Sequence, residues 1–221
     1  MTLYGNKIVH DDLKDYGHLY SLSSYSNHCA KGPKETIRIH SHNVDNLSLY
    51  ATNVTNQLII NEEKKQDADI HLWQEIGLCW PKVDKYDSWQ SRTKGLGFHS
   101  NLTCNTTELE HSLSYQSGGI GVVLSHIMAP RVIGKGADIR GLGRWVWTRL
   151  QGKAQAVTTI SAYRPCKPSS SGVKTVYEQH ARELPVLSDP RTQFLIHLKQ
   201  CTQDREAHGD LIIIGMDLND L

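Results

Sequence analysis

The feature that most constrains this chain is the run LIIIGMDLND at residues 211–220, in which apolar residues lead directly into an acid. A short apolar run that follows a glycine and ends in polar residues predicts a buried strand. Asp217 and Asn219 lie two positions apart, and residues at that spacing share one face of an extended chain. Because a buried carboxylate without a partner is costly, the fold must bring other groups to the tip of this strand.

Two other predicted strands end in residues of the same kind. The alternating segment at 36–44 contains Asn43, and Asp45 follows two positions later on the same expected face. The short strand at 68–75 ends in Glu75. Taken singly, an acid or amide after a strand is most often a turn residue. Carboxylates gathered from several strand ends suit Mg²⁺ or Mn²⁺, so together they predict a shared cation.

The order of the predicted elements is mixed. Strands that are connected by helices flank a middle segment made of strands. One of these helices should begin at Asp189, a cap that is followed by Pro190 in the first turn. Three strand-like runs follow one another without a helix and are therefore predicted to be antiparallel neighbours. They are GGIGVVLSH, GRWVWTRLQ and AVTTISAYRP. Residues 81–117 are expected to form a long loop, residues 1–34 a polar, loosely ordered N-terminal extension, and residues 35–221 one domain.

Composition excludes little beyond a membrane protein. The chain has 24 basic and 23 acidic side chains, so only a local patch could attract nucleic acid. No apolar run approaches the ~20 residues of a membrane span, and the N-terminus lacks the apolar core of a signal peptide. The five cysteines show no zinc-binding spacing. We therefore expect an intracellular protein with no membrane partner.

Four short motifs occur in a fixed order along the chain. They are Asn-Val-Asp at 43–45, Gln-Glu at 74–75, Ser-Ala-Tyr at 161–163 and Asp-Leu-Asn at 217–219. In this order they resemble the endonuclease/exonuclease/phosphatase superfamily, which includes apurinic/apyrimidinic endonucleases and deoxyribonuclease I-like enzymes. The resemblance covers about residues 36–221 and implies a four-layer α/β sandwich of two mixed β-sheets flanked by helices. Family members have a further Asp-His pair beyond this point, so the resemblance also implies a domain whose C-terminal part is missing.

The resemblance assigns residues to the metal-binding part of the expected site. Glu75 matches the main magnesium ligand, and Asp45 matches a metal-side acid of the apurinic-type branch. Asn43 matches an asparagine that supports the metal and the phosphate. The implied cofactor is Mg²⁺, or Mn²⁺ in its place.

The resemblance also assigns residues to the reaction itself. Asp217 matches the acid that orients or deprotonates the attacking water, and Asn219 matches an asparagine that contacts the phosphate. Tyr163 matches a tyrosine near the scissile phosphate. The chain departs from the family at Met216, where a second glycine is usual.

Three arginines are candidates for contacts with the substrate: Arg164, Arg144 and Arg149. A guanidinium beside Tyr163 suits a phosphate, although Arg164 could equally pair with a surface acid. The basic segment that contains Arg144 and Arg149 could track a phosphate backbone or form a solvated face. Its tryptophans could stack on bases, but core packing is the stronger expectation. The pair His40 and His42 could bind a metal on one strand face, although such pairs are mostly structural.

The leading prediction is a divalent-metal-dependent DNA endonuclease domain, inactive or barely active as residues 1–221 because the C-terminal Asp-His pair is absent. In the form that they take here, the motifs also resemble the endonuclease regions of retrotransposons. That resemblance would make a fused reverse transcriptase the neighbouring domain. A phosphatase or lipid phosphodiesterase on the same scaffold is the second reading. A non-catalytic remnant or nucleic-acid-binding module is the third.

Overall fold

The computed structural model describes most of the chain, and all structural statements below concern this part. The described residues are 19–22, 36–48, 50, 53–79, 82–84, 88–93, 96, 99–103, 116–167, 175–185 and 188–219. The expected N-terminal extension, residues 1–34, lies outside them apart from residues 19–22, which form a strand.

The first of two β-sheets has five strands in the order β1-β2-β3-β5-β4. They are β1 (Leu19–Leu22), β2 (Ile37–Asn43), β3 (Ile70–Gln74), β5 (Ile120–Leu124) and β4 (His99–Thr103). β1, β2 and β3 run parallel, whereas β5 is antiparallel to both of its neighbours. The sheet is therefore mixed, as the resemblance implied.

The second sheet has four strands in the order β6-β7-β8-β9. They are β6 (Val132–Ala137), β7 (Trp145–Leu150), β8 (Val157–Tyr163) and β9 (Leu211–Asp217). β6, β7 and β8 form an antiparallel meander, and β9 returns parallel to β8.

The sequence-based account of the middle of the chain was wrong in three places. β5 is not a neighbour of β7, because it pairs with β3 and β4 in the first sheet. The chain then crosses to the second sheet through a 3₁₀ turn (Ala129–Arg131) and forms β6, which was not predicted. The expected loop at 81–117 contains both β4 and the short helix α2 (Trp89–Thr93).

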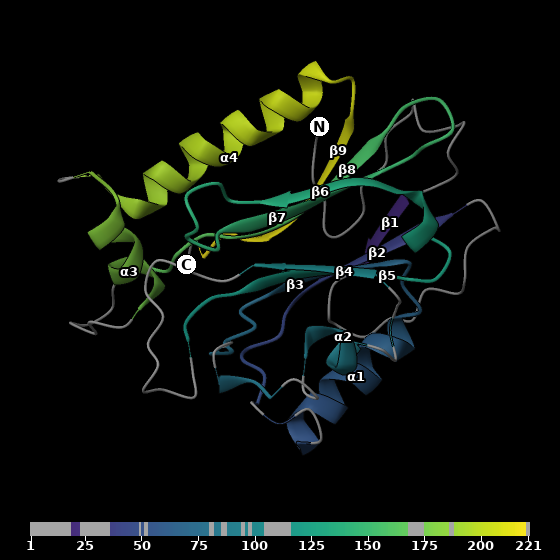
Figure 1. Cartoon of the computed structure of the whole chain (residues 1–221), viewed down its shortest axis with the longest axis horizontal. Coiled ribbons are helices and arrows are strands. Elements are labelled where there is room, and N and C mark those ends of the chain that lie inside the picture. Colours follow the sequence, from purple (N-terminus) through teal and green to yellow (C-terminus); the bar gives the residue numbers. More distant parts are fainter. Residues whose placement is uncertain are drawn as a thin grey trace.

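The molecule is layered, with the sheets face to face and helices outside (Figure 1). The helices α1 (Val54–Gln66) and α2 lie on the outer face of the first sheet, and α4 (Pro190–Ala207) covers the outer face of the second. The short α3 (Val176–Glu183) lies beside one end of α4. This arrangement confirms the predicted fold class.

Local sequence explains where the long helices begin. Asp189 caps α4 by accepting hydrogen bonds from the backbone N–H groups of Arg191 and Thr192, and Pro190 occupies the first turn, as predicted. Asn53 caps α1 through Thr55 N–H in the same way. Within the part of the chain that the structure describes, no helix is long and apolar enough to cross a membrane.

The largest core cluster fills the space between the two sheets. Alternate side chains of β2, β3 and β5 meet alternate side chains of β7, β8 and β9 there. Its fully buried members include Leu72, Ile120, Val122, Leu124 and Val146. The core between the two sheets therefore fixes where the ends of the strands lie.

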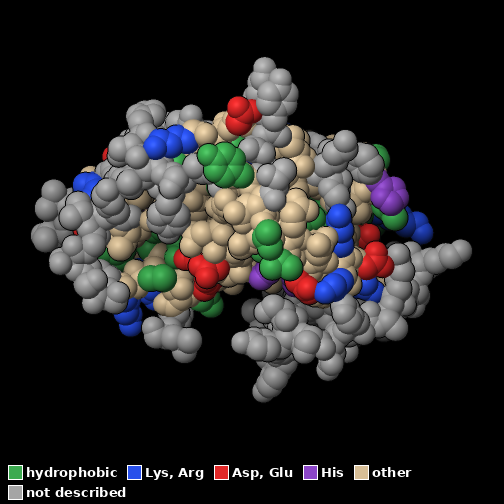
Figure 2. Space-filling model, turned by 90° about the horizontal axis from the view of Figure 1, so that it is seen from below, with side chains coloured by type: hydrophobic (Ala, Val, Ile, Leu, Met, Phe, Trp, Pro, Cys, Tyr) green, Lys and Arg blue, Asp and Glu red, His purple; other side chains and the backbone are tan. Residues whose placement is uncertain are grey.

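On the face that bears α1 and α2, acidic and basic side chains are interspersed with apolar ones (Figure 2).

Candidate active site

Two pairs of parallel strands, one pair in each sheet, end at the same edge of the sandwich. Asn43 of β2 lies beside Gln74 of β3, and Tyr163 of β8 lies beside Asp217 of β9. Glu75 follows β3 directly. Parallel neighbours present their carboxyl ends together, so this edge collects polar side chains from four strands.

The side chain of Asn43 joins the two sheets at this edge. Its Nδ2 donates to Glu75 Oε2 and to Asp217 Oδ2, each at 2.8 Å. Its Oδ1 accepts from the backbone N–H of Asp45 at 3.0 Å, which fixes the orientation of the amide. One amide group therefore holds two carboxylates close together.

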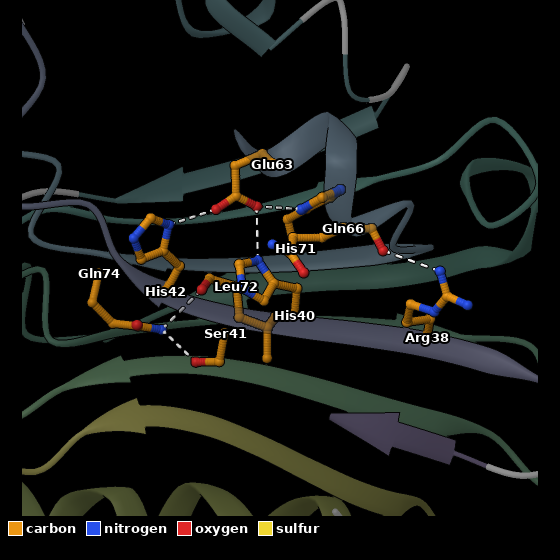
Figure 3. Close-up of polar contacts among 9 residues, drawn as sticks. All are labelled: Arg38, His40, Ser41, His42, Glu63, Gln66, His71, Leu72 and Gln74. Carbon is orange, nitrogen blue, oxygen red and sulfur yellow. Dashed lines mark hydrogen bonds and ion pairs between the residues drawn. The ribbon is translucent and has the colours of Figure 1, made fainter. Parts of the chain in front are cut away.

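A second bridge lies just inside the first, at Gln74. Its Nε2 donates to Ser161 Oγ at 3.0 Å and to the Leu72 carbonyl at 3.1 Å, and Figure 3 shows the latter contact beside Ser41. At Gly215 on β9, an added Cβ would lie 2.6 Å from Leu72 Cδ1 and 2.7 Å from Ser41 Oγ. The glycine therefore allows the sheets to approach closely just before the site.

The phenol of Tyr163 supports Glu75 from the second sheet. Its hydroxyl donates a short hydrogen bond to Glu75 Oε1 and lies 3.5 Å from Cys166 Sγ. Burial raises the pKa of Tyr163 well above its usual range, and the contacts with Cys166 and Glu75 raise it further. Tyr163 therefore stays protonated and acts as a donor to the carboxylate.

Asn219 closes the site on the side of Asp217. Its backbone N–H donates to Asp217 Oδ1 at 3.0 Å, and its Nδ2 donates to the Arg164 carbonyl at 2.6 Å. The Arg164 N–H in turn donates to the Asp217 carbonyl at 3.0 Å. Arg164 is thus placed beside the site by its backbone.

The backbone around the site is unusual. Among the described residues other than glycine, left-handed φ angles occur at Asp45 (+44°), Asn46 (+70°), Glu75 (+53°) and Asn219 (+48°), and otherwise only at Asp67 where α1 ends. Such a conformation costs about 1–3 kcal/mol at a residue such as glutamate. Asn46 N–H steadies the turn by donating to the Glu75 carbonyl at 2.8 Å.

These angles correct two sequence-based expectations. Asn43 and Asp45 do not share a strand face, because β2 ends at Asn43 and the chain turns at Asp45. Asp45 is exposed, and its Oδ1 accepts from Asn46 Nδ2 at 3.1 Å rather than contacting Glu75 or Asp217. Asn219 likewise lies beyond the end of β9, in a turn.

The structure does not bring Arg144 and Arg149 to the site. The guanidinium of Arg144 is buried against Asp138, with Nε–Oδ2 at 2.5 Å and Nη2–Oδ1 at 2.9 Å. Arg149 pairs with Asp210, which precedes β9 and so lies at the opposite end of the strand from Asp217. Both arginines therefore neutralise acids of the second sheet. Trp145 beside them packs on Phe194 of α4, with ring centroids 6.1 Å apart, as the core-packing alternative predicted.

Sequence reasoning gave no role to Gln74, Ser161, Cys166 or Gly215, which position the predicted residues. Gln74 belongs to the Gln-Glu motif and Ser161 to the Ser-Ala-Tyr motif, so these motifs were the signal that could have pointed to the two residues. Their contact spans 87 positions of sequence and could not be read from spacing.

The residues present fit a hard divalent cation. Glu75 and Asp217 make no ion pair with any described Lys or Arg, yet both lie within hydrogen-bonding distance of one amide nitrogen. Two carboxylates held together without a counter-charge favour binding of a cation through oxygen atoms. The open side of Glu75 and Asp217 is therefore where such an ion fits.

The fold and the site at its converging strand ends define a DNase I-like architecture, that of the endonuclease/exonuclease/phosphatase fold. The human Nocturnin catalytic domain with bound sulfate is similar, with a TM-score of 0.52 and 15% identity over 84% of this chain and 64% of that one. Beta toxin from Staphylococcus aureus, in a mutant form with bound magnesium ions, gives a TM-score of 0.51 and 15% identity over 81% of this chain and 63% of that one.

This chain therefore spans less than two thirds of the length of either neighbour. At such low identity the likeness shows the fold alone. No protein-family model and no curated protein matches the sequence.

Proposed function

We propose that this chain is the catalytic region of a divalent-metal-dependent phosphodiesterase that cleaves DNA as an endonuclease. The observation that supports this most directly is the contact of Asn43 with both Glu75 and Asp217, closed by Tyr163. The sulfate of the Nocturnin structure and the magnesium of the beta toxin structure show that anions and Mg²⁺ occur with this fold. Phosphodiester hydrolysis requires a site that binds an anionic phosphate group and a divalent metal ion.

Each residue has a role that its position allows. Glu75 would hold Mg²⁺ or Mn²⁺, which would withdraw charge from the phosphoryl oxygens. Asp217 would orient or deprotonate the attacking water. Asn43 and Tyr163 keep Glu75 in place, and Asn219 has a second amide N–H that could meet a phosphate oxygen. Asp45 is exposed beside the site, where it would act only through water or a bound ion.

DNA is proposed as the substrate because the motifs resemble retrotransposon endonuclease regions, and a fused reverse transcriptase is the proposed neighbouring domain. Arg164 is the arginine best placed to meet the DNA backbone, since its main chain contacts both Asp217 and Asn219. Residues 1–221 alone should cleave slowly. Among the described residues no histidine contacts Glu75 or Asp217, so none of the described imidazoles is placed there to protonate the leaving oxygen. Cleavage at an ordinary nuclease rate by this chain would contradict that part of the proposal.

The test is nicking of supercoiled plasmid with protein in excess, in Mg²⁺, in Mn²⁺ and after chelation. Nicking should require the metal, and Asp217→Asn should lower its rate by roughly 10²–10⁴-fold. Glu75→Gln should abolish the nicking that Mg²⁺ or Mn²⁺ stimulates, because the variant loses the carboxylate that would hold the ion. The matched control is Glu62→Gln, because Glu62 is an exposed acid that pairs with Lys65. Nicking that persists without metal, or that both site variants retain, would contradict the proposal.

Two other functions are separated by simple measurements. A phosphatase or lipid phosphodiesterase would hydrolyse inositol phosphates or sphingomyelin in preference to plasmid. A non-catalytic module would bind DNA with an affinity that neither metal nor Glu75→Ala changes.

A further inference from the structure

A second polar cluster lies on the outer face of the first sheet, under α1 (Figure 3). Glu63 of α1 points down at three imidazoles from β2 and β3, which surround its carboxylate. His40 Nδ1 lies 3.0 Å and His71 Nδ1 2.5 Å from Glu63 Oε2, and His42 Nδ1 lies 2.6 Å from Oε1. Asn43 points to the opposite face of β2, so this cluster is separate from the candidate active site.

The charge of Glu63 has no ordinary partner. Its side chain is 0% exposed, and its contacts are the three imidazoles, with no described Lys or Arg among them. Burial alone would raise its pKa, but hydrogen bonds from His40, His42 and His71 outweigh burial and lower the pKa below its usual range. The group is therefore an ionised carboxylate inside the fold, where an uncompensated charge is costly.

The docking of α1 depends on this cluster. The buried residues of α1 are Asn56, Ile60 and Glu63, of which only Ile60 is apolar. Ile59 adds a partly buried side chain to this apolar contact, but the helix offers few apolar residues, so polar contacts contribute to its docking on the sheet. Glu63 supplies those contacts at its C-terminal half.

The same atoms form a ligand set. One atom each from His40, His42 and Glu63 lie within 4.8 Å of one another. Two imidazole nitrogens and one carboxylate oxygen are the ligands that Zn²⁺ and related late transition metals prefer, in contrast to the all-oxygen ligands of Mg²⁺. The His42 side chain is 25% exposed, so solvent reaches one ligand of the cluster.

We propose that His40, His42 and Glu63 form a zinc-class metal site that fastens α1 to β2. His71 then acts as a positioning residue, because its Nδ1 bonds to the same carboxylate. Each imidazole would bind the metal in its neutral form, with its proton on Nε2 and its Nδ1 lone pair directed at the ion. A proton on Nδ1 competes with the metal for that lone pair, so affinity should fall as the pH falls. The site stands independently of any phosphodiesterase activity.

The test uses the full chain, stripped of metal by a chelator and titrated with Zn²⁺ by calorimetry and with Co²⁺ by visible absorption. We expect one equivalent of Zn²⁺, an affinity that falls as the pH falls, and the absorption spectrum of tetrahedral or five-coordinate Co²⁺. His42→Ala should weaken binding by at least roughly tenfold. It is the most suitable variant because His42 is the most exposed ligand, and thermal unfolding will show whether the variant folds.

Two controls separate this site from other ones. His208→Gln removes an exposed histidine at the end of α4, and Glu75→Gln alters the candidate active site; neither should change Zn²⁺ affinity. Absence of saturable Zn²⁺ binding by the folded chain would overturn the proposal, and so would equal affinity in His42→Ala. In either case the cluster is a hydrogen-bonded network that holds α1 without metal.

Discussion

At the scale of single residues, one amide and one phenol determine how the two site carboxylates are held. Asn43 donates to both acids, and Tyr163 donates to Glu75 from the other side. In the absence of a cation these donors are what offset the repulsion between Glu75 and Asp217. Each donor can be removed by a single substitution, Asn43→Ala for the amide and Tyr163→Phe for the phenol hydroxyl.

Asn43→Ala should destabilise the metal-free protein by about 1–3 kcal/mol, because two partly buried carboxylates lose a shared donor. Part of the loss should return on addition of Mg²⁺, which binds the folded state only. Urea unfolding with and without Mg²⁺ measures both effects. Gln200→Ala is the control, since Gln200 donates to Asp204 at 2.9 Å on the exposed face of α4. Equal, small losses in the two variants would contradict the bridging role of Asn43.

Tyr163→Phe should make the protein less sensitive to alkali. The pKa of Tyr163 is raised in the folded state by burial, by Cys166 and by Glu75, whereas the unfolded value is about 10. Above pH ~10 the folded state therefore holds a proton that the unfolded state releases, so stability falls as the pH rises. Unfolding free energies measured from pH 8 to pH 11 should decline more steeply for the wild type than for Tyr163→Phe. Parallel slopes would show that the phenol titrates normally.

At the scale of elements, the sequence predicted the strands with strong apolar runs and missed those without. β9 and the start of α4 were predicted from LIIIGMD and from the Asp189–Pro190 cap. β6 was missed because VIGKGA contains two glycines and has little strand propensity. Pairing with β7 makes it a strand, and the Trp147 indole covers Gly136 so closely that an added Cβ would lie 2.6 Å from it. Tertiary contact decided the conformation there.

Gly215→Ala tests the close approach of the two sheets. The new methyl group would meet Leu72 and Ser41 at under 3 Å, so β9 must move away from the first sheet. We expect a loss of about 1–3 kcal/mol in stability. Because Asp217 lies two residues away, weaker metal binding should accompany it. Gly134→Ala is the matched control, since its Cβ would meet its nearest neighbour at an ordinary 3.6 Å. Identical melting temperatures for the two variants would contradict this reading of the interface.

At the scale of the whole molecule, the fold class followed from the mixed order of elements together with four motifs. Of the predicted site residues, Asn43, Glu75, Tyr163 and Asp217 lie in contact with one another, and their roles stay predictions. The side-chain direction of Asp45 did not follow, because the expected shared strand face was preferred over the turn that Asp45 and Asn46 also favour. The ion pair of Arg149 was also beyond reach, since Asp210 lies 61 positions away in the sequence. Long-range pairing of charges depends on sheet register, which spacing does not reveal.

The central claim is that Glu75 and Asp217 form one divalent-metal site, and binding of Mn²⁺ followed by electron paramagnetic resonance tests it most directly. The wild type and Glu62→Gln should each bind one Mn²⁺ that Mg²⁺ displaces, and Glu75→Gln should bind it at least roughly tenfold more weakly. His42→Ala should match the wild type, which separates this site from the histidine cluster. Equal Mn²⁺ affinity in the wild type and Glu75→Gln would contradict the account.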